Sequence, residues 1–172
     1  MTITNRLVRF VPATQTVNTD RAYHTIGEDF FVKDDTVVGR GQHEADVLRL
    51  LKDLRGVPRI HSSYVMEDKG LHRIVMSLMP GKTVENILGS LTPGDSHTII
   101  AGLLEIYTGL LCAGVVHGDI NVSNVLYDKE TKTVSLIDFE TATIVEPRGH
   151  RAHGQDLLGP PWGILDLWRG LP

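Results

Sequence analysis

Hydrophobic and polar residues alternate over short distances in the first part of the chain and follow helical spacing further on. Three alternating runs predict strands, at residues 7–11, 22–26 and 30–33. A helix is predicted from Gln42 to Leu54. The next two apolar runs, around 63–66 and 71–76, flank the turn Glu67–Gly70 and predict a hairpin. The order predicts a β-rich unit that contains one helix.

The pattern changes at Met79-Pro80-Gly81-Lys82, which we interpret as a hinge before a helical part. A short helix is predicted over 84–88. A capping box that begins at Thr92 predicts the start of a long helix, which runs to about Cys112 and has a wide apolar stripe typical of a core helix. Further short strands are predicted at residues 115–116, 125–127 and 134–137.

Composition is that of an ordinary globular protein and excludes several functional classes. The 172 residues suit one domain or two small lobes, and 41% are hydrophobic. A net charge of −4 argues against a general nucleic-acid surface, so no DNA partner is expected. The single cysteine excludes an intramolecular disulfide framework. No apolar run reaches membrane-spanning length, so we expect no membrane contact and a cytoplasmic location, with the nucleus and export into a host cell left open. Nothing indicates an oligomeric state.

Glu44 is the first residue that calls for a specific partner. On a helix it shares one face with Val47, Leu48 and Leu51, at spacings of three, four and seven. A carboxylate on such a face is costly unless it is paired, and Lys33 at the end of the preceding strand is the natural partner. The alternative is that Glu44 lies in the first turn of the helix and is favoured only by the helix dipole.

A second group of polar residues follows the apolar strands of the second half. Asp119 begins an Asp-x-x-x-x-Asn spacing that ends at Asn124, although Asp119 alone also suits a surface turn. Asp138 follows four strand residues, where a magnesium ion would offset the cost of its carboxylate. We expect His117 to support the loop from the core. A set in this order is typical of phosphoryl transfer from a nucleotide: Lys33, Glu44, Asp119, Asn124 and Asp138.

With these residues in this order, positions 20–145 resemble the protein-kinase-like superfamily. The resemblance implies an α+β, bilobal fold and a single kinase-like domain over 1–172. Residues 1–79 would form a β-rich N-lobe with one helix, and residues 80–172 a truncated helical C-lobe. It also implies ATP and Mg²⁺ as cofactors.

The same resemblance implies a role for each polar residue. Lys33 would bind the phosphates as a catalytic residue, and Glu44 would orient Lys33. The segment Ser77-Leu78-Met79 would meet the adenine, so that Ser77 and Met79 are nucleotide-binding residues. Asp119 would align the acceptor hydroxyl. Asn124 and Asp138 would be the metal ligands.

The chain departs from the usual protein-kinase pattern at several positions. Gly118 replaces an arginine that contacts phosphorylated activation loops, Asn121 replaces a lysine on the γ-phosphate, and Glu140 replaces a glycine. No Gly-x-Gly-x-x-Gly precedes Lys33. In its His-Gly-Asp loop the chain is similar to aminoglycoside and choline phosphotransferases and to the small kinase of the KEOPS tRNA-modification complex.

These features favour a small, atypical Ser/Thr protein kinase, with a protein substrate preferred over a small molecule. Two alternatives stay open: a small-molecule phosphotransferase of the aminoglycoside or choline type, and a nucleotide-binding pseudokinase or scaffolding module. Only about thirty residues follow Glu140. Among them, Trp162 and Trp168 are expected to anchor the tail to the C-lobe.

Overall fold

The computed structural model describes residues 15–18, 22–26, 29–145 and 171. The N-terminal half is built on an antiparallel sheet with the strand order β1-β2-β3-β5-β4. Its strands are β1 (Gln15–Asn18), β2 (Ala22–Ile26), β3 (Phe30–Asp35), β4 (Ile60–Met66) and β5 (Leu71–Ser77). Strands 22–26 and 30–33 and the hairpin were predicted. The strand predicted at 7–11 and the proposed anchors Trp162 and Trp168 lie outside the described residues.

One helix, α1 (Val38–Leu50), packs against β5 and β4. The predicted bounds, Gln42 to Leu54, were wrong by four residues at each end. The first turn contains Gly39, Arg40 and Gly41, which carry no apolar periodicity, so the pattern becomes visible only at Gln42. The helix nevertheless starts early, because Asp35 at the end of β3 accepts a hydrogen bond from the Val37 backbone N–H at 2.7 Å.

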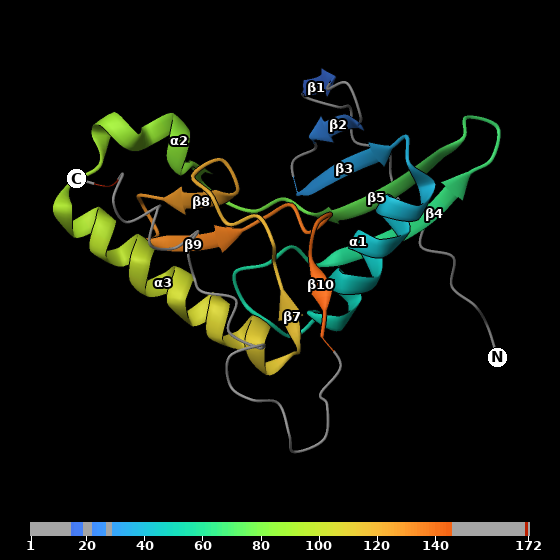
Figure 1. Ribbon diagram of the computed structural model, residues 1–172. Coiled ribbons are helices and arrows are strands. Elements are labelled where there is room, and N and C mark those ends of the chain that lie inside the picture. The colour runs from blue at the N-terminus through green and yellow to red at the C-terminus, as the bar shows by residue number, and fades with distance from the viewer. Residues whose placement is uncertain (1–14, 19–21, 27–28, 146–170, 172) are drawn as a thin grey trace, which may run out of the picture.

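The C-terminal half is mixed helix and sheet (Figure 1). Its helices are α2 (Val84–Ile87), a 3₁₀ turn (Leu88–Ser90) and α3 (Pro93–Cys112). The predicted capping box is confirmed: the Thr92 hydroxyl accepts from the Asp95 backbone N–H, and the Asp95 carboxylate accepts from that of Thr92. The strands are β6 (Lys82–Thr83), β8 (Val125–Asp128) and β9 (Thr133–Leu136), in the order β6-β8-β9, and the pair β7 (Val115–Val116) and β10 (Thr143–Ile144).

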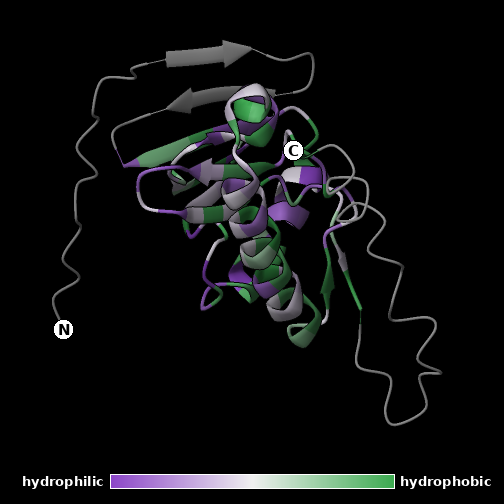
Figure 2. Cartoon of the chain, turned by 90° about the vertical axis from the view of Figure 1, so that its left-hand side faces the viewer, coloured by the Kyte–Doolittle hydropathy of each residue, from purple (hydrophilic) through white to green (hydrophobic). Residues whose placement is uncertain are grey.

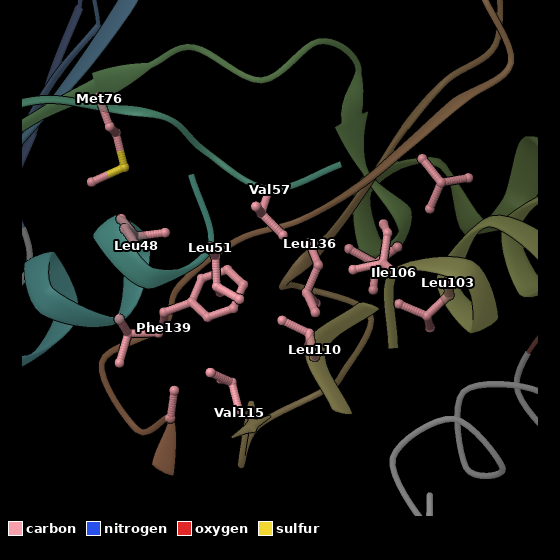
Figure 3. Close-up of a cluster of buried hydrophobic side chains, with 14 of the residues drawn as sticks. Leu48, Leu51, Val57, Met76, Leu103, Ile106, Leu110, Val115, Leu136 and Phe139 are labelled. Atoms are coloured by element: carbon pink, nitrogen blue, oxygen red, sulfur yellow. The ribbon is translucent and has the colours of Figure 1, made fainter. Parts of the chain in front are cut away.

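A single cluster of apolar side chains connects the two halves (Figure 3). Leu51 enters it from the residue that follows α1, Leu110 from α3 and Leu136 from β9, and all three are at most 1% exposed. Figure 2 shows α3 with both polar and apolar positions, as expected for a helix with one buried face. The predicted α+β architecture, β-rich with one helix and then helical, is confirmed. No helix in the described part of the chain combines the length and hydropathy needed to cross a membrane.

Candidate active site

Lys33 and Glu44 form a buried ion pair between β3 and α1. Lys33 lies on a strand that is paired on both sides, with β2 and β5. Its side chain is 7% exposed, and its Nζ atom is 2.9 Å from Glu44 Oε2. Glu44 lies two turns into α1 and is 2% exposed. The predicted pairing is therefore confirmed, and the alternative of a first-turn position for Glu44 is wrong.

Burial and ion pairing act in opposite directions on these two groups. Burial alone would lower the pKa of Lys33, but the carboxylates of Glu44 and Asp138 outweigh it and hold that pKa above its ordinary value. Burial raises the pKa of Glu44, and the ammonium group of Lys33 opposes the rise. Lys33 consequently keeps its positive charge at neutral pH.

Asp138 is the third member of this cluster. It follows β9 with a φ of 66°, in the left-handed region. Residues other than glycine rarely adopt this conformation, although Asp is among those that tolerate it, and such residues concentrate at functional sites. The Asp138 Oδ1 atom is 2.9 Å from Lys33 Nζ. The turn after β9 thus brings a carboxylate to the lysine of β3.

Phe139 fixes the segment that carries Asp138. Its side chain is fully buried in the cluster that contains Leu51 (Figure 3). Its backbone N–H donates to Glu44 Oε1 at 3.3 Å, so Glu44 connects α1 both to β3 and to the segment after β9. The Phe139 ring meets the His117 ring edge-on, with centroids 4.6 Å apart.

His117 supports the loop as the sequence predicted. Its Nδ1 atom accepts a hydrogen bond from the Asp119 backbone N–H at 3.2 Å. The neutral ring therefore carries its proton on Nε2, which lies 3.0 Å from the Ile137 carbonyl and donates to it. Burial lowers the pKa of His117, which favours this neutral form. The imidazole thus joins the loop at Asp119 to the segment at Asp138.

Two amide side chains hold the exposed carboxylate of Asp119. Asn124 Nδ2 donates to Asp119 Oδ2 at 2.9 Å, and Asn121 Nδ2 donates to Asp119 Oδ1 at 3.0 Å. The Asn121 Oδ1 atom also accepts from the backbone N–H of Ser123 at 2.8 Å, which closes the turn. The sequence analysis noted Asn121 only because it replaces a lysine. The structure adds that it orients Asp119.

Ser77 and Met79 lie at the end of β5, apart from the charged cluster. The Ser77 hydroxyl accepts from the Arg59 backbone N–H at 2.9 Å and donates to Met79 Sδ at 3.6 Å. The Leu78 backbone N–H donates to the Asp29 carbonyl at 3.2 Å. In the described part of the chain, no hydrogen bond of either side chain reaches the cluster, so a role for them in adenine binding stays a prediction.

Two solved structures share this arrangement of elements, and one of them is named a kinase. The chain superposes on the granulovirus kinase PK-1 of Cydia pomonella granulovirus with a TM-score of 0.66 over 78% of its length, at 20% identity. The chain has a protein-kinase-like fold. A second structure, WbdD, matches with a TM-score of 0.62, also over 78% of this chain at 20% identity. The chain covers 52% and 34% of these two proteins.

Two curated relatives with kinase names match part of the kinase-like chain. It is 34% identical over 108 residues to the dual specificity protein kinase zakA of Dictyostelium discoideum, and 30% identical over 112 residues to CDPK-related kinase 5 of Arabidopsis thaliana. The chain spans only 13% and 18% of the length of these relatives. No protein-family profile matches the chain.

The structure brings into this candidate site two residues that the sequence analysis did not place there, Arg40 and Glu140. Arg40 forms two hydrogen bonds to the buried Asp35 carboxylate, both at 2.8 Å. Glu140 Oε2 lies 3.2 Å from Lys33 Nζ and 3.6 Å from Arg40 Nε. Arg40 precedes Glu44 by four residues and so shares its helix face. If the sequence analysis had placed the start of the helix at Val38, Arg40 would have been recognised on the same face as Glu44.

The oxygen atoms at this site fit a magnesium ion that arrives with phosphate. Asn124 uses its amide nitrogen on Asp119, and within the described residues no donor occupies its Oδ1 atom. Asp138 uses Oδ1 on Lys33 and is 37% exposed. No group of three or more His, Cys, Asp or Glu side chains among the described residues could hold a metal alone. Mg²⁺ commonly takes one or two protein oxygens and completes its shell with phosphate and water.

Proposed function

We propose that the chain is an ATP- and Mg²⁺-dependent phosphotransferase that transfers the γ-phosphoryl group of ATP to a serine or threonine hydroxyl of a protein. The observation that carries the proposal is the joining of Lys33 to both Glu44 and Asp138. The loop that holds Asp119 lies beside this cluster, because the Ile137 backbone N–H donates to the Asn124 carbonyl at 2.9 Å. Phosphoryl transfer uses these residue types together.

Each residue has one task in this mechanism. ATP with Mg²⁺ supplies the phosphoryl group and the positive charge that offsets negative charge in the transition state. Lys33 binds phosphate oxygens, and Glu44 holds its ammonium group in place. Asn124 and Asp138 provide oxygen ligands for the metal. Asp119, oriented by its two amide donors, aligns the acceptor hydroxyl and takes its proton.

The preference for a protein acceptor rests on the relatives. Both curated relatives have kinase names, and that of zakA specifies a protein kinase. The loop spacing from Asp119 to Asn124 also follows the protein-kinase pattern.

Nucleotide binding tests the first half of the proposal. A ligand that binds only the folded state raises the melting temperature, and at 100 times its Kd it adds about 2.7 kcal/mol. We expect ATP with Mg²⁺ to stabilise the wild type, and Asp138→Asn to lose most of that shift while it stays folded, since Asn also tolerates the left-handed backbone. The matched control is Asp53→Asn at an exposed site. Unfolding of Asp138→Asn would make Asp138 structural and contradict its assignment as a metal ligand.

Phosphoryl transfer tests the second half. With labelled ATP, Mg²⁺ and generic protein substrates, we expect Asp119→Asn to transfer about 100-fold less phosphate than the wild type. Equal transfer by the two proteins would contradict the proposal. A nucleotide-dependent thermal shift without transfer to any acceptor would indicate a pseudokinase. Transfer only to amino alcohols or aminoglycosides would indicate a small-molecule phosphotransferase.

A further inference from the structure

One carboxylate oxygen lies between the two cations of the site. Glu140 Oε2 is 3.2 Å from Lys33 Nζ and 3.6 Å from Arg40 Nε. The Lys33 side chain is 7% exposed and that of Arg40 is 18% exposed. An anion between two largely buried cations is in strong electrostatic attraction to both. Lys33 and Arg40 therefore form an anion site, and a side chain of the same protein fills it.

The charges around this anion site do not balance. Among the described residues, two cations, Lys33 and Arg40, face four carboxylates, which belong to Asp35, Glu44, Asp138 and Glu140. Counting unit charges, two positive against four negative leaves an excess of two negative charges. Such an excess opposes the approach of a triphosphate unless a carboxylate moves away or a metal ion enters.

Unlike Asp35 and Glu44, Glu140 is free to leave. Asp35 is fully buried and accepts from both the Val37 backbone N–H and the Arg40 guanidinium. Glu44 is 2% exposed and accepts from the Phe139 backbone N–H. Glu140 is 26% exposed, and within the described residues its carboxylate contacts only the two cations. It can swing toward solvent without breaking a backbone hydrogen bond.

We propose that Glu140 is an internal placeholder in the anion site of Lys33 and Arg40, and that a nucleotide phosphate oxygen takes the place of Glu140 Oε2 between them. This inference rests on the proposed function. It makes Arg40 a second phosphate-binding residue beside Lys33, in a chain that has no Gly-x-Gly-x-x-Gly before that lysine. Phosphate binding then competes with an interaction inside the protein.

Removing the charge of the placeholder tests the proposal directly. A side chain that fills the site about 90% of the time weakens the apparent affinity of a competing ligand about tenfold. We therefore expect Glu140→Gln to bind ATP with Mg²⁺, and inorganic tripolyphosphate without metal, about 5- to 10-fold more tightly than the wild type by calorimetry. The matched control is Glu105→Gln on the exposed face of α3, which should leave both affinities unchanged.

A second variant tests the role of Arg40. Arg40 alone cannot be removed cleanly, because Asp35 would stay buried and unpaired. The double variant Asp35→Asn/Arg40→Gln removes both charges and preserves a hydrogen bond. We expect it to bind tripolyphosphate at least threefold more weakly than the wild type. In this background, Glu140→Gln should tighten binding less than it does in the wild type, because one of the two cations is absent.

The outcomes separate this inference from the proposed function. Unchanged affinity in Glu140→Gln, with a wild type that binds ATP, overturns only the placeholder. Weaker binding of ATP with Mg²⁺ in that variant also overturns it, and would indicate that Glu140 is a metal ligand. If neither protein binds either compound, both the placeholder and the proposed function fail.

Discussion

Two residues in the left-handed backbone region, Asp138 and Gly118, determine the shape of the site. Gly118 has a φ of 82°, and a Cβ atom at this position would lie 2.7 Å from the Thr141 carbonyl oxygen. The glycine therefore allows the loop at Asp119 to approach the segment after Asp138. An arginine, which many kinases have at this position, would not fit this backbone.

A substitution at Gly118 should consequently be costly. We expect Gly118→Ala to destabilise the protein by about 1–2 kcal/mol, since the left-handed conformation costs about that much for an L-residue. Urea unfolding measures the change. The control is Gly94→Ala in α3, where the nearest atom to an added methyl group, Thr92 Oγ1, would be 3.8 Å away. An equal decrease in the free energy of unfolding in both variants would contradict a specific requirement for glycine at position 118.

Asn121 allows a test of how Asp119 is oriented. If the proposed function holds, Asn121→Ala should lower kcat about tenfold with little change in the KM for ATP, because it removes one of the two amide donors to Asp119. Steady-state kinetics separate the two parameters. Ser123→Ala serves as the comparison, since Ser123 contacts Asn121 and makes no hydrogen bond to Asp119. A change in KM alone would contradict an orienting role.

Among the helices and strands, α1 has a position that depends closely on one residue without a side chain. It carries both Arg40 and Glu44, and it approaches β5 closely at one glycine. A Cβ atom on Gly41 would lie 2.8 Å from the His72 Cβ atom and 3.3 Å from that of Asp35. At Gly39, in the same helix, a Cβ atom would meet nothing within 4 Å. The helix can therefore approach the sheet only because Gly41 has no side chain.

The two glycines of α1 form a matched pair. We expect Gly41→Ala to destabilise the protein by about 1–3 kcal/mol, because the helix must move away from β5 or strain its neighbours. Gly39→Ala should stabilise it by about 0.5–1 kcal/mol, because alanine is the better helix former. Urea unfolding of both variants checks the signs. Similar effects in both would mean that α1 does not pack closely on His72.

The sequence predicted those helices and strands whose apolar side chains repeat with a regular period. It did not predict elements that are defined only by contacts with other parts of the chain. The β4–β5 hairpin and α3 have clear patterns. The two-residue strands β6 and β10 are too short to show a period, and only their pairing with β8 and β7 defines them. At the site, Lys33 and Glu44 were found because a buried charge needs a partner. Arg40 was not found because the helix was predicted to begin only at Gln42, and the contact of Glu140 with Lys33 was not found because it depends on distances across the fold.

At the scale of the whole molecule, each half of the chain contains a buried histidine. His72 lies on β5, and His117 lies below the loop that carries Asp119; both are fully buried. Burial lowers the pKa of each below the ordinary value of 6.5. The folded protein thus keeps both rings neutral at pH values where the unfolded chain binds protons.

A fall in pH should therefore reduce the contribution of both histidines to the free energy of unfolding. The unfolded state binds more protons below about pH 6.5, so the stabilisation from these rings is present above that pH and is lost as the pH falls. Glu44, whose pKa is raised, acts in the opposite sense, so a comparison between variants isolates the histidines. The free energy of unfolding between pH 7.5 and 5.5 should fall less steeply in His72→Gln and His117→Gln than in the wild type. Parallel curves would contradict this.

The connection between β3 and α1 has a consequence for control of the protein. Only Thr36 and Val37 separate Asp35 from the first residue of the helix, and Asp35 binds both Val37 and Arg40. Because this connection is so short, α1 should move together with β3. Lys33 on the strand and Glu44 on the helix would then keep their relative positions. We therefore do not expect an outward movement of the helix to separate Lys33 from Glu44. Switching between idle and working forms would depend on what fills the space beside Lys33.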